Sequence, residues 1–265
     1  MNPHDTLHIP LDQYQAATDL LRDKNILITG AGDGIGRALA LGCARHGATV
    51  ILLGRTVKKL EAVYDEIEAA GYPQAAIFPL DLEKTAAEDY EQLGAALGEH
   101  FSRLDGLIHN AATLGQHTPL VLADPQMWQR VLQTNLTAPC LITRACYPLL
   151  KAADSASVIF SSDAVAERGR AYWGAYAVSK AGLVNMMQIL ADEWENNTRI
   201  RVTALDPGAV QTRLRRQAFP GEDPRHVPAP DTCLPAFLYL LDSGKPGLSG
   251  KHLHWDGQTL SLSGD

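Results

Sequence analysis

The feature that most constrains this chain is a glycine-rich turn that directly follows a run of apolar residues. Ile26-Leu27-Ile28-Thr29 leads into Gly30, and further glycines stand at positions 32, 34 and 36 before a helical pattern begins. The first N–H groups of a helix have no partner within it and lie at the positive end of its dipole, so such a turn can bind phosphate. Because glycine lacks a Cβ, a ligand can approach the backbone closely. The pattern predicts a buried strand, a tight turn and a helix start.

The glycines follow the spacing T-G-x-x-x-G-x-G, formed by Thr29, Gly30, Gly34 and Gly36. The usual dinucleotide fingerprint G-x-G-x-x-G does not fit, because Ile35 occupies the place of its last glycine. A glycine-rich turn with a purely structural role is the alternative interpretation of this loop taken alone. We assign the loop to cofactor binding, with Gly30, Asp33, Gly34, Ile35 and Gly36 as its residues.

Composition narrows the classes of protein. A chain of 265 residues with 46% hydrophobic and 20% charged residues is typical of one globular α/β domain. The net charge of −7 disfavours binding to nucleic acid. No apolar run could span a bilayer, and the polar start does not resemble a signal peptide. The four cysteines contain no C-x-x-C pair, so we expect reduced thiols, no metal site and a cytoplasmic protein.

Strand and helix patterns alternate along the chain. We expect strands at 26–29, 49–53, 76–80, 106–109, 157–160, 201–205 and 252–255, and helices at 35–46, 86–101, 128–150, 181–194 and 232–241. Fully apolar strands such as 49–53 are typical of parallel sheets. This predicts a single α/β domain over residues 25–258, with a lead-in at 1–24, a mobile lid at 211–230 and a tail at 259–265.

The end of the second expected strand bears on the choice of cofactor. An enzyme that prefers NAD places an acid there to bind the ribose 2′-OH, whereas this chain has Gly54 and Arg55. A guanidinium binds a 2′-phosphate with two hydrogen bonds, and Lys58 and Lys59 follow closely. We therefore favour NADP(H) over NAD(H), although Asp33 argues the other way and arginines at strand ends are often only solvated charges.

Polar residues at other strand ends are further candidates. Asp81 and Leu82 follow the third expected strand, where Asp81 could accept a hydrogen bond from adenine or cap the next helix. Asn110 and Ala111 follow the fourth strand and leave room for a cofactor. Asn135 lies inside the expected helix 128–150, although asparagine forms helices poorly, so we expect it to make a hydrogen bond there.

Tyr176 and Lys180 are spaced i, i+4 on an expected helix, so they share one helix face. An ammonium group near a phenol lowers the phenol pKa and prepares it for acid–base work. Such a pair is also common as plain surface chemistry, and this second interpretation remains open for the pair alone.

Taken together, these motifs resemble the short-chain dehydrogenases/reductases. The resemblance runs in order over residues 24–258, through Thr29-Gly30-x-x-x-Gly34-x-Gly36, Asn110-Ala111, Asn135, Tyr176-x-x-x-Lys180 and Pro207-Gly208-x-x-x-Thr212. The residues around 170–180 and Ala218-Phe219-Pro220 resemble a bacterial subgroup described as YciK-like oxidoreductases.

The resemblance implies a Rossmann-type doubly wound parallel sheet of about seven strands with helices on both faces. It also implies hydride transfer between NADP(H) and a small-molecule carbonyl or secondary alcohol, in a homodimer or homotetramer without nucleic-acid or membrane partners. Tyr176 would be the acid/base, Lys180 would lower its pKa and hold the nicotinamide ribose, and Asn135 would fix a water. Further cofactor contacts would come from Pro207, Gly208, Val210 and Thr212.

Four positions depart from the family pattern. His109, Ala112 and Asp206 are mild changes. The fourth is serious, because Asp163 occupies the place of the substrate-orienting serine thirteen residues before the tyrosine, and Ser162 is one residue away. An ionised aspartate there would repel a developing alkoxide. We expect Ser162 to take the role through a shifted register; the alternative is a non-catalytic NADP(H)-binding sensor or scaffold that Asp163 has disabled.

Overall fold

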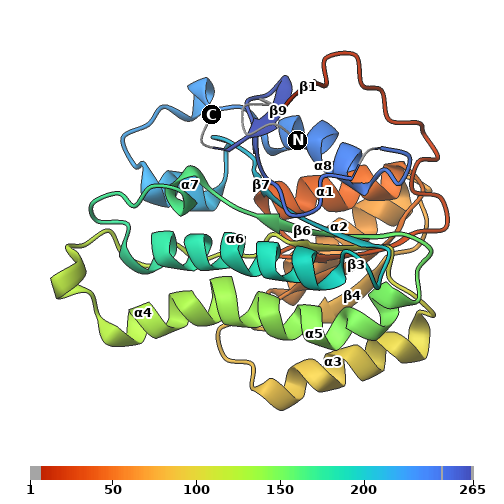
Figure 1. Ribbon diagram of the computed structural model, residues 1–265, viewed down its shortest axis with the longest axis horizontal. Coiled ribbons are helices and arrows are strands. Elements are labelled where there is room, and N and C mark those ends of the chain that lie inside the picture. The colour runs from red at the N-terminus through yellow and green to blue at the C-terminus, as the bar shows by residue number, and fades with distance from the viewer. Residues whose placement is uncertain (1–6, 246, 264–265) are drawn as a thin grey trace.

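The computed structural model describes residues 7–245 and 247–263, which form a sheet covered by helices on both faces (Figure 1). The strands are β1 (His8–Pro10), β2 (Asn25–Thr29), β3 (Thr49–Gly54), β4 (Ala76–Pro79), β5 (Gly106–His109), β6 (Ala156–Ser161), β7 (Ile200–Asp206), β8 (His252–Trp255) and β9 (Thr259–Leu262). Their order is β1-β9-β8-β7-β6-β5-β2-β3-β4. The seven strands from β8 to β4 are parallel, and β9 and β1 add an antiparallel edge.

Two groups of helices cover the two faces of this sheet. The helices are α1 (Gly34–Arg45), α2 (Val57–Ala69), α3 (Ala87–His100), α4 (Pro125–Leu132), α5 (Ala138–Lys151), α6 (Gly174–Trp194), α7 (Arg213–Ala218) and α8 (Leu234–Leu241). One core cluster joins the sheet to α1, α2 and α8, and the other joins it to α3, α5 and α6. The expected α/β Rossmann-type fold is confirmed, with nine strands in place of about seven.

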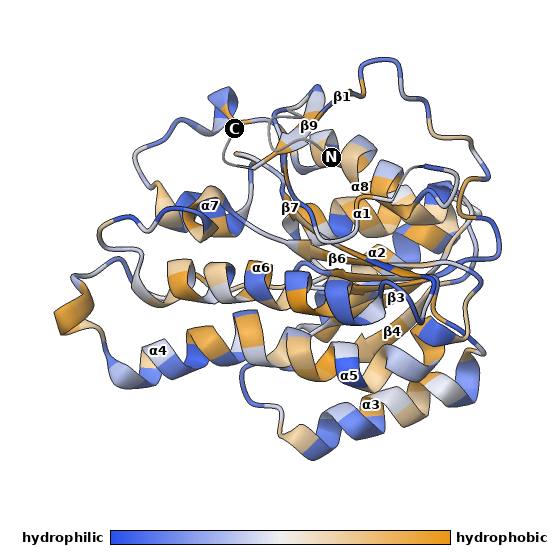
Figure 2. Cartoon of the chain, viewed as in Figure 1, coloured by the Kyte–Doolittle hydropathy of each residue, from blue (hydrophilic) through white to orange (hydrophobic). Residues whose placement is uncertain are grey.

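The strands form because their side chains are apolar on both sides. Ile26 and Ile28 belong to one core cluster, and Leu27 between them belongs to the other. Successive side chains of a strand point to opposite faces, so a strand covered on both faces must be apolar throughout. Figure 2 shows this as a hydrophobic central sheet, whereas the helices alternate between apolar and polar faces.

The strand order places the expected site residues together at the carboxyl ends of the parallel strands. From β2 the chain runs outward to β3 and β4 and then returns to β5 on the other side of β2. In such a sheet, ligands bind at the carboxyl ends of the strands where the order reverses. The carboxyl ends of β2 and β5 carry Gly30 and Asn110, two of the predicted cofactor residues.

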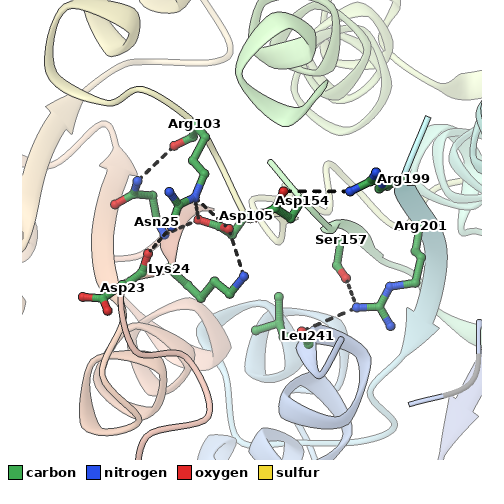
Figure 3. Close-up of polar contacts among 10 residues, drawn as sticks. All are labelled: Asp23, Lys24, Asn25, Arg103, Asp105, Asp154, Ser157, Arg199, Arg201 and Leu241. Carbon is green, nitrogen blue, oxygen red and sulfur yellow. Dashed lines mark hydrogen bonds and ion pairs between the residues drawn. The ribbon is translucent and has the colours of Figure 1, made fainter. Parts of the chain in front are cut away.

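Buried polar contacts hold the sheet together at the amino-terminal ends of its strands (Figure 3). The Asp105 carboxylate is 5% exposed and accepts hydrogen bonds from the Asn25 backbone at 3.0 Å, Lys24 Nζ at 3.2 Å and Arg103 Nε at 3.2 Å. Arg201 donates to Ser157 Oγ at 2.7 Å on the neighbouring strand. These contacts tie strand starts together and lie away from the predicted site.

Four segments differ from the expected pattern of elements. The helix expected over 128–150 is divided into α4, a π-helical turn (Gln133–Thr137) and α5. The segments expected as lead-in and tail both contribute strands, because His8–Pro10 pairs with Thr259–Ser261. The lid at 211–230 contains the short helix α7 and a 3-10 turn (Pro224–His226).

Within the described residues, no helix is long and apolar enough to cross a membrane.

Candidate active site

The glycine turn between β2 and α1 has the shape that its spacing predicts. Gly30 has φ +70° and Gly34 has φ +50°, both in the left-handed region that favours glycine. A Cβ on Gly36 would lie 2.2 Å from the Gly30 carbonyl oxygen, so this position also excludes any side chain. The turn therefore brings bare backbone to the start of α1, where N–H groups have no helical partner.

Asp33 caps that helix start. Its carboxylate accepts from the Gly34 N–H at 2.8 Å and pairs with Lys59 Nζ of α2 at 2.5 Å. The hydrogen bond from Lys59 is the main cause of the lowered pKa of Asp33. Arg55 is exposed at the end of β3, beside the same turn, and makes no ion pair among the described residues. A basic side chain without an ion-pair partner among the described residues therefore stands at the end of β3, the position from which the sequence analysis expects NADP(H) to be favoured.

Thr29 and Asn110 join the ends of β2 and β5. The Thr29 hydroxyl accepts hydrogen bonds from the backbone N–H groups of Asn110 and Ala111, both at 3.0 Å. The Asn110 side chain donates to the Thr29 carbonyl at 3.2 Å. These bonds join the two strand ends at the point where the strand order reverses, so Asn110 has a structural role here.

Asn135 is buried in the π-helical turn between α4 and α5. Its side-chain oxygen accepts from the Thr113 N–H at 2.8 Å, and its Nδ2 donates to the Thr113 carbonyl at 2.9 Å and to Ser179 Oγ at 3.1 Å. Such π turns occur frequently at functional sites. Asn135 therefore makes the hydrogen bonds expected of it, and they link the loop after β5 to α6 one residue before Lys180.

The hydroxyl of Tyr176 donates to Asp163 Oδ2 at 3.1 Å. Ser162, which we expected in that place, has a buried Oγ with no hydrogen-bond partner within the described part of the chain. One step along an extended backbone reverses side-chain direction, so only one of the two residues can reach Tyr176. The expected register shift is absent because the Ser162 N–H continues the ladder to Leu205 at 2.7 Å, which leaves Asp163 facing the tyrosine.

Burial and nearby carboxylates raise the pKa of Tyr176 well above its ordinary value of 10. Burial is the largest cause, and Asp163 adds to it through its charge and its hydrogen bond. Lys180 is also buried; its Nζ donates to the Ser161 carbonyl at 2.6 Å and lies 5.6 Å from the centre of the Tyr176 ring. Burial lowers the pKa of Lys180 to about 8, against the opposing charges of Asp163 and Asp206.

An apolar and aromatic cluster surrounds Tyr176. The Trp173 ring lies 5.8 Å from that of Tyr176, 5.7 Å from that of Phe219 and 4.7 Å from that of His117. Phe219 follows α7, so the expected lid packs against the residues that precede α6. At the other end of this segment, a Cβ on Gly34 would lie 3.1 Å from the Thr212 methyl group, which places the lid's base against the glycine turn.

Asp206, at the end of β7, is 6% exposed and accepts from the Gly208 N–H at 2.9 Å. Its other oxygen lies 3.1 Å from His254 Nδ1 on β8, and this hydrogen bond is the main cause of the raised pKa of His254. Pro207, Gly208 and Val210 follow at the same edge of the sheet. Sequence reasoning missed His254, because only strand pairing brings it opposite Asp206.

The contacts of His109, a departure from the family pattern, and of the predicted cofactor residues Asp81 and Leu82 are local. The pKa of His109 is lowered to about 3 by complete burial, and its ring stacks on Phe160 at 4.7 Å. Asp81 caps its own loop, accepting from the Glu83 N–H at 3.3 Å, and Leu82 beside it is buried. The sequence analysis did not identify Ser179, whose hydroxyl accepts the hydrogen bond from Asn135, because a serine within a helical pattern has no distinguishing signal.

The geometry of this edge fits a dinucleotide. A Cβ on Gly30 or Gly36 would lie 3.0 Å or less from other protein atoms, so these positions admit no side chain over the start of α1, and Arg55 lies at the adjoining strand end. The predicted residues of the crevice and the Tyr176/Lys180 pair lie along the same edge, whereas the Asp105 contacts lie at the other.

Comparison with known proteins agrees with this geometry. The family model for short chain dehydrogenases matches residues 24–223. The oxidoreductase YciK of Escherichia coli K12 is 45% identical over 228 residues, which cover 86% of this chain and 90% of YciK. A short chain dehydrogenase structure from Pseudomonas syringae has a TM-score of 0.89 at 44% identity, covering 91% of this chain and 98% of that one.

A further structure, of a short chain dehydrogenase from Escherichia coli CFT073 complexed with NADPH, has a TM-score of 0.87 at 43% identity. It covers 90% of this chain and 98% of that one. With the glycine turn, the Tyr176/Lys180 pair and the matched family model all in one chain, this protein belongs to the short-chain dehydrogenase/reductase family of oxidoreductases.

Proposed function

We propose that this protein transfers a hydride between NADP(H) and a small molecule, with the carbonyl/secondary alcohol couple that the family resemblance implies as the reacting group. The observation that carries the proposal is the buried Tyr176/Lys180 pair, held at the carboxyl ends of the parallel strands by the bond from Lys180 to the Ser161 carbonyl, on the same side of the sheet as the glycine turn that opens α1. A buried, hydrogen-bonded tyrosine next to a lysine is suited to act on a proton at a reacting heteroatom.

Several residues would hold the cofactor. The backbone of Gly30, Gly34 and Gly36 would receive the pyrophosphate, and Arg55 would bind the 2′-phosphate with a charge-assisted hydrogen bond. Asp81 and Leu82 would lie at the adenine. The NADPH complex of a 43% identical relative supports this choice of cofactor.

The chemistry at the nicotinamide end of the proposed cofactor site would depend on Tyr176 and its neighbours. The nicotinamide, when bound, supplies or accepts the hydride. Lys180 would bind the ribose hydroxyl groups and, through its charge, oppose the rise in the tyrosine pKa that burial causes. Asn135 would hold the loop after β5 and α6 in register, and Thr212 would contact the carboxamide.

The test is a fluorescence titration with NADPH and NADH, together with turnover of a panel of ketones, aldehydes and alcohols. Arg55→Ala should weaken NADPH binding by about ten- to hundredfold, the worth of one charge-assisted bond, and leave NADH binding unchanged. Tyr176→Phe should lower carbonyl turnover by about 10²–10⁴ and leave NADPH binding intact. Arg199→Ala, an exposed arginine paired with Asp154 at the opposite edge, is the control.

A second candidate function is a non-catalytic NADP(H)-binding sensor or scaffold, favoured by the Tyr176–Asp163 hydrogen bond, which engages the proton that the reaction would use. Tight NADPH binding without turnover of any substrate by the wild type would favour it.

We also propose a homodimer or homotetramer. The family is usually oligomeric, and Val178 and Ile189 expose 47% and 50% of their surface on α6. Light scattering of the purified chain would measure its mass, and a monomer at micromolar concentration would contradict this assignment.

A further inference from the structure

Asp163 occupies the position beside the reacting bond where the family places a hydroxyl donor. Both of its carboxylate oxygens already accept hydrogen bonds: Oδ1 from the Val165 N–H at 3.0 Å, and Oδ2 from the Tyr176 hydroxyl at 3.1 Å. Accepting at both oxygens is what an ionised carboxylate does. The side chain therefore offers a negative charge and acceptor lone pairs to anything that binds next to Tyr176.

This carboxylate forms no direct ion pair among the described residues. Within residues 7–245 and 247–263, no lysine, arginine or histidine nitrogen lies within 4.0 Å of Asp163. The Lys180 ammonium donates to the Ser161 carbonyl, and the Arg215 guanidinium makes two hydrogen bonds to Glu222, at 2.6 and 2.7 Å. The partly exposed Asp163 carboxylate therefore forms no ion pair, although its charge opposes the fall in the pKa of Lys180 and contributes to the raised pKa of Arg215.

An unpaired carboxylate discriminates between substrates. A ketone oxygen gains negative charge as hydride reaches its carbon, so Asp163 would oppose its reduction. A protonated imine, C=N–H⁺, is positive and carries an N–H donor, so it would make a charge-assisted hydrogen bond to Asp163. The carboxylate would also raise the pKa of a bound imine and so keep it protonated, which is the form that accepts hydride.

The rings around Tyr176 favour the same kind of ligand. Arg215 Cζ lies 3.8 Å from the centre of the Phe219 ring, and Arg170 Cζ lies 6.0 Å from that of Trp173. These aromatic faces already attract cations within the protein itself. A flat cyclic imine could lie against Trp173 while its nitrogen faces Asp163.

We infer that this site acts on C=N bonds in preference to C=O bonds, with Asp163 as the catalytic residue that binds the protonated nitrogen; the inference rests on the proposed hydride transfer. The hydride adds to the carbon of the C=N bond, and the π electron pair moves onto nitrogen. The iminium is thereby reduced to a neutral amine while NADPH is oxidised to NADP⁺. The substrate arrives with its proton, so Tyr176 does not have to release one.

The test compares two bicyclic substrates, 3,4-dihydroisoquinoline as the imine and 1-tetralone as the ketone. Turnover with NADPH is measured for the wild type, Asp163→Ser and Asp163→Asn. The wild type should favour the imine in kcat/KM by at least about tenfold, and Asp163→Ser should lower the imine-to-ketone ratio by about a hundredfold, the worth of one charge-assisted bond. Asp154→Asn, at an exposed acid, is the matched control and should keep the wild-type ratio.

A binding measurement keeps the test independent of turnover. Calorimetry of the NADPH-saturated protein with 1,2,3,4-tetrahydroisoquinoline, a cationic amine, should show an affinity that both Asp163 variants lose by about tenfold or more. Binding of neutral 1-tetralol should not fall in the same variants. NADPH titration of each variant checks that it is folded.

The outcomes separate the two proposals. Ketone reduction whose rate relative to the imine is the same in the wild type and Asp163→Ser would overturn the inference and leave hydride transfer standing. Amine binding that is indifferent to Asp163 would also overturn it. Absence of NADPH oxidation with either substrate in every variant would overturn the proposed function and the inference together.

Discussion

At the scale of single residues, the charge states of the buried groups in the site depend on burial and on their neighbours. Tyr176 and Lys180 are buried, and burial shifts their pKa values in the directions that favour neutral forms. Burial alone would thus leave a phenol and an amine, and the acidic residues Asp163 and Asp206 work to keep Lys180 charged. A lysine buried in this way should cost the fold some stability.

Lys180→Met tests this cost. Because the pKa of Lys180 is lowered to about 8 in the folded protein, the unfolded chain binds more protons between pH 8 and 10.5, and stability rises with pH in that window. The penalty is fully present below pH 8. We expect Lys180→Met to raise the free energy of unfolding by about 2 kcal/mol at pH 7, after loss of the Ser161 hydrogen bond, and to lose that advantage towards pH 9.5. Urea unfolding of the cofactor-free protein measures it; a less stable variant at pH 7 would contradict the assignment.

At the scale of elements, the turn between β2 and α1 illustrates how close backbone approach specifies residue type. A Cβ on Gly36 would lie 2.2 Å from the Gly30 carbonyl oxygen and 2.7 Å from Asn110 Nδ2. Gly30 directly follows β2, and Asn110 directly follows β5. A methyl group there would push apart the two strand ends that the cofactor is proposed to bridge.

Gly36→Ala should therefore lower the free energy of unfolding by about 1–3 kcal/mol through overpacking, and weaken NADPH binding by more than about tenfold. Gly98→Ala is the matched control, because a Cβ at Gly98 on α3 would meet nothing within 4 Å. That change should raise stability by about 0.5–1 kcal/mol through helix propensity and leave binding unchanged. Equal effects of the two substitutions in thermal unfolding and NADPH titration would refute the argument from contact distance.

At the scale of the whole molecule, the carboxyl ends and the amino ends of the strands carry different kinds of residues. The candidate site lies at the carboxyl ends of the strands, whereas the buried contacts of Asp105 and Arg201 lie at their amino ends (Figure 3). Asp105 joins the starts of β2 and β5, whose other ends carry Gly30 and Asn110. The buried stabilising contacts and the candidate site thus lie at opposite ends of the same strands.

Asp105→Ala should lower the free energy of unfolding by about 2–3 kcal/mol, since the Asn25 N–H and two basic groups lose their acceptor. NADPH affinity, measured well below the unfolding temperature, should stay within about twofold, because the change is at the far edge of the sheet. Asp154→Asn, with a carboxylate 99% exposed at the same edge, should change stability by less than about 0.5 kcal/mol. A large loss of NADPH affinity in Asp105→Ala would show that the edges are coupled.

The sequence by itself determined what depends on neighbouring residues. The glycine spacing predicted the turn and helix start, apolar runs predicted the parallel strands, and the i, i+4 spacing placed Tyr176 and Lys180 on one helix face. These features follow from local sterics and from burial on both faces of a sheet, so a short window of sequence carries them.

Only the tertiary structure decided what depends on contacts between distant segments. Pairing of β6 with β7 extends through the Ser162 N–H to Leu205 and so directs Asp163, not Ser162, at Tyr176. Asn135 forms hydrogen bonds with Thr113 and Ser179 and lies in a π turn that interrupts the single helix expected there. The pairing of β1 with β9 adds two strands to the sheet. In each case the deciding partner lies more than twenty residues away in the chain, beyond the reach of any local pattern.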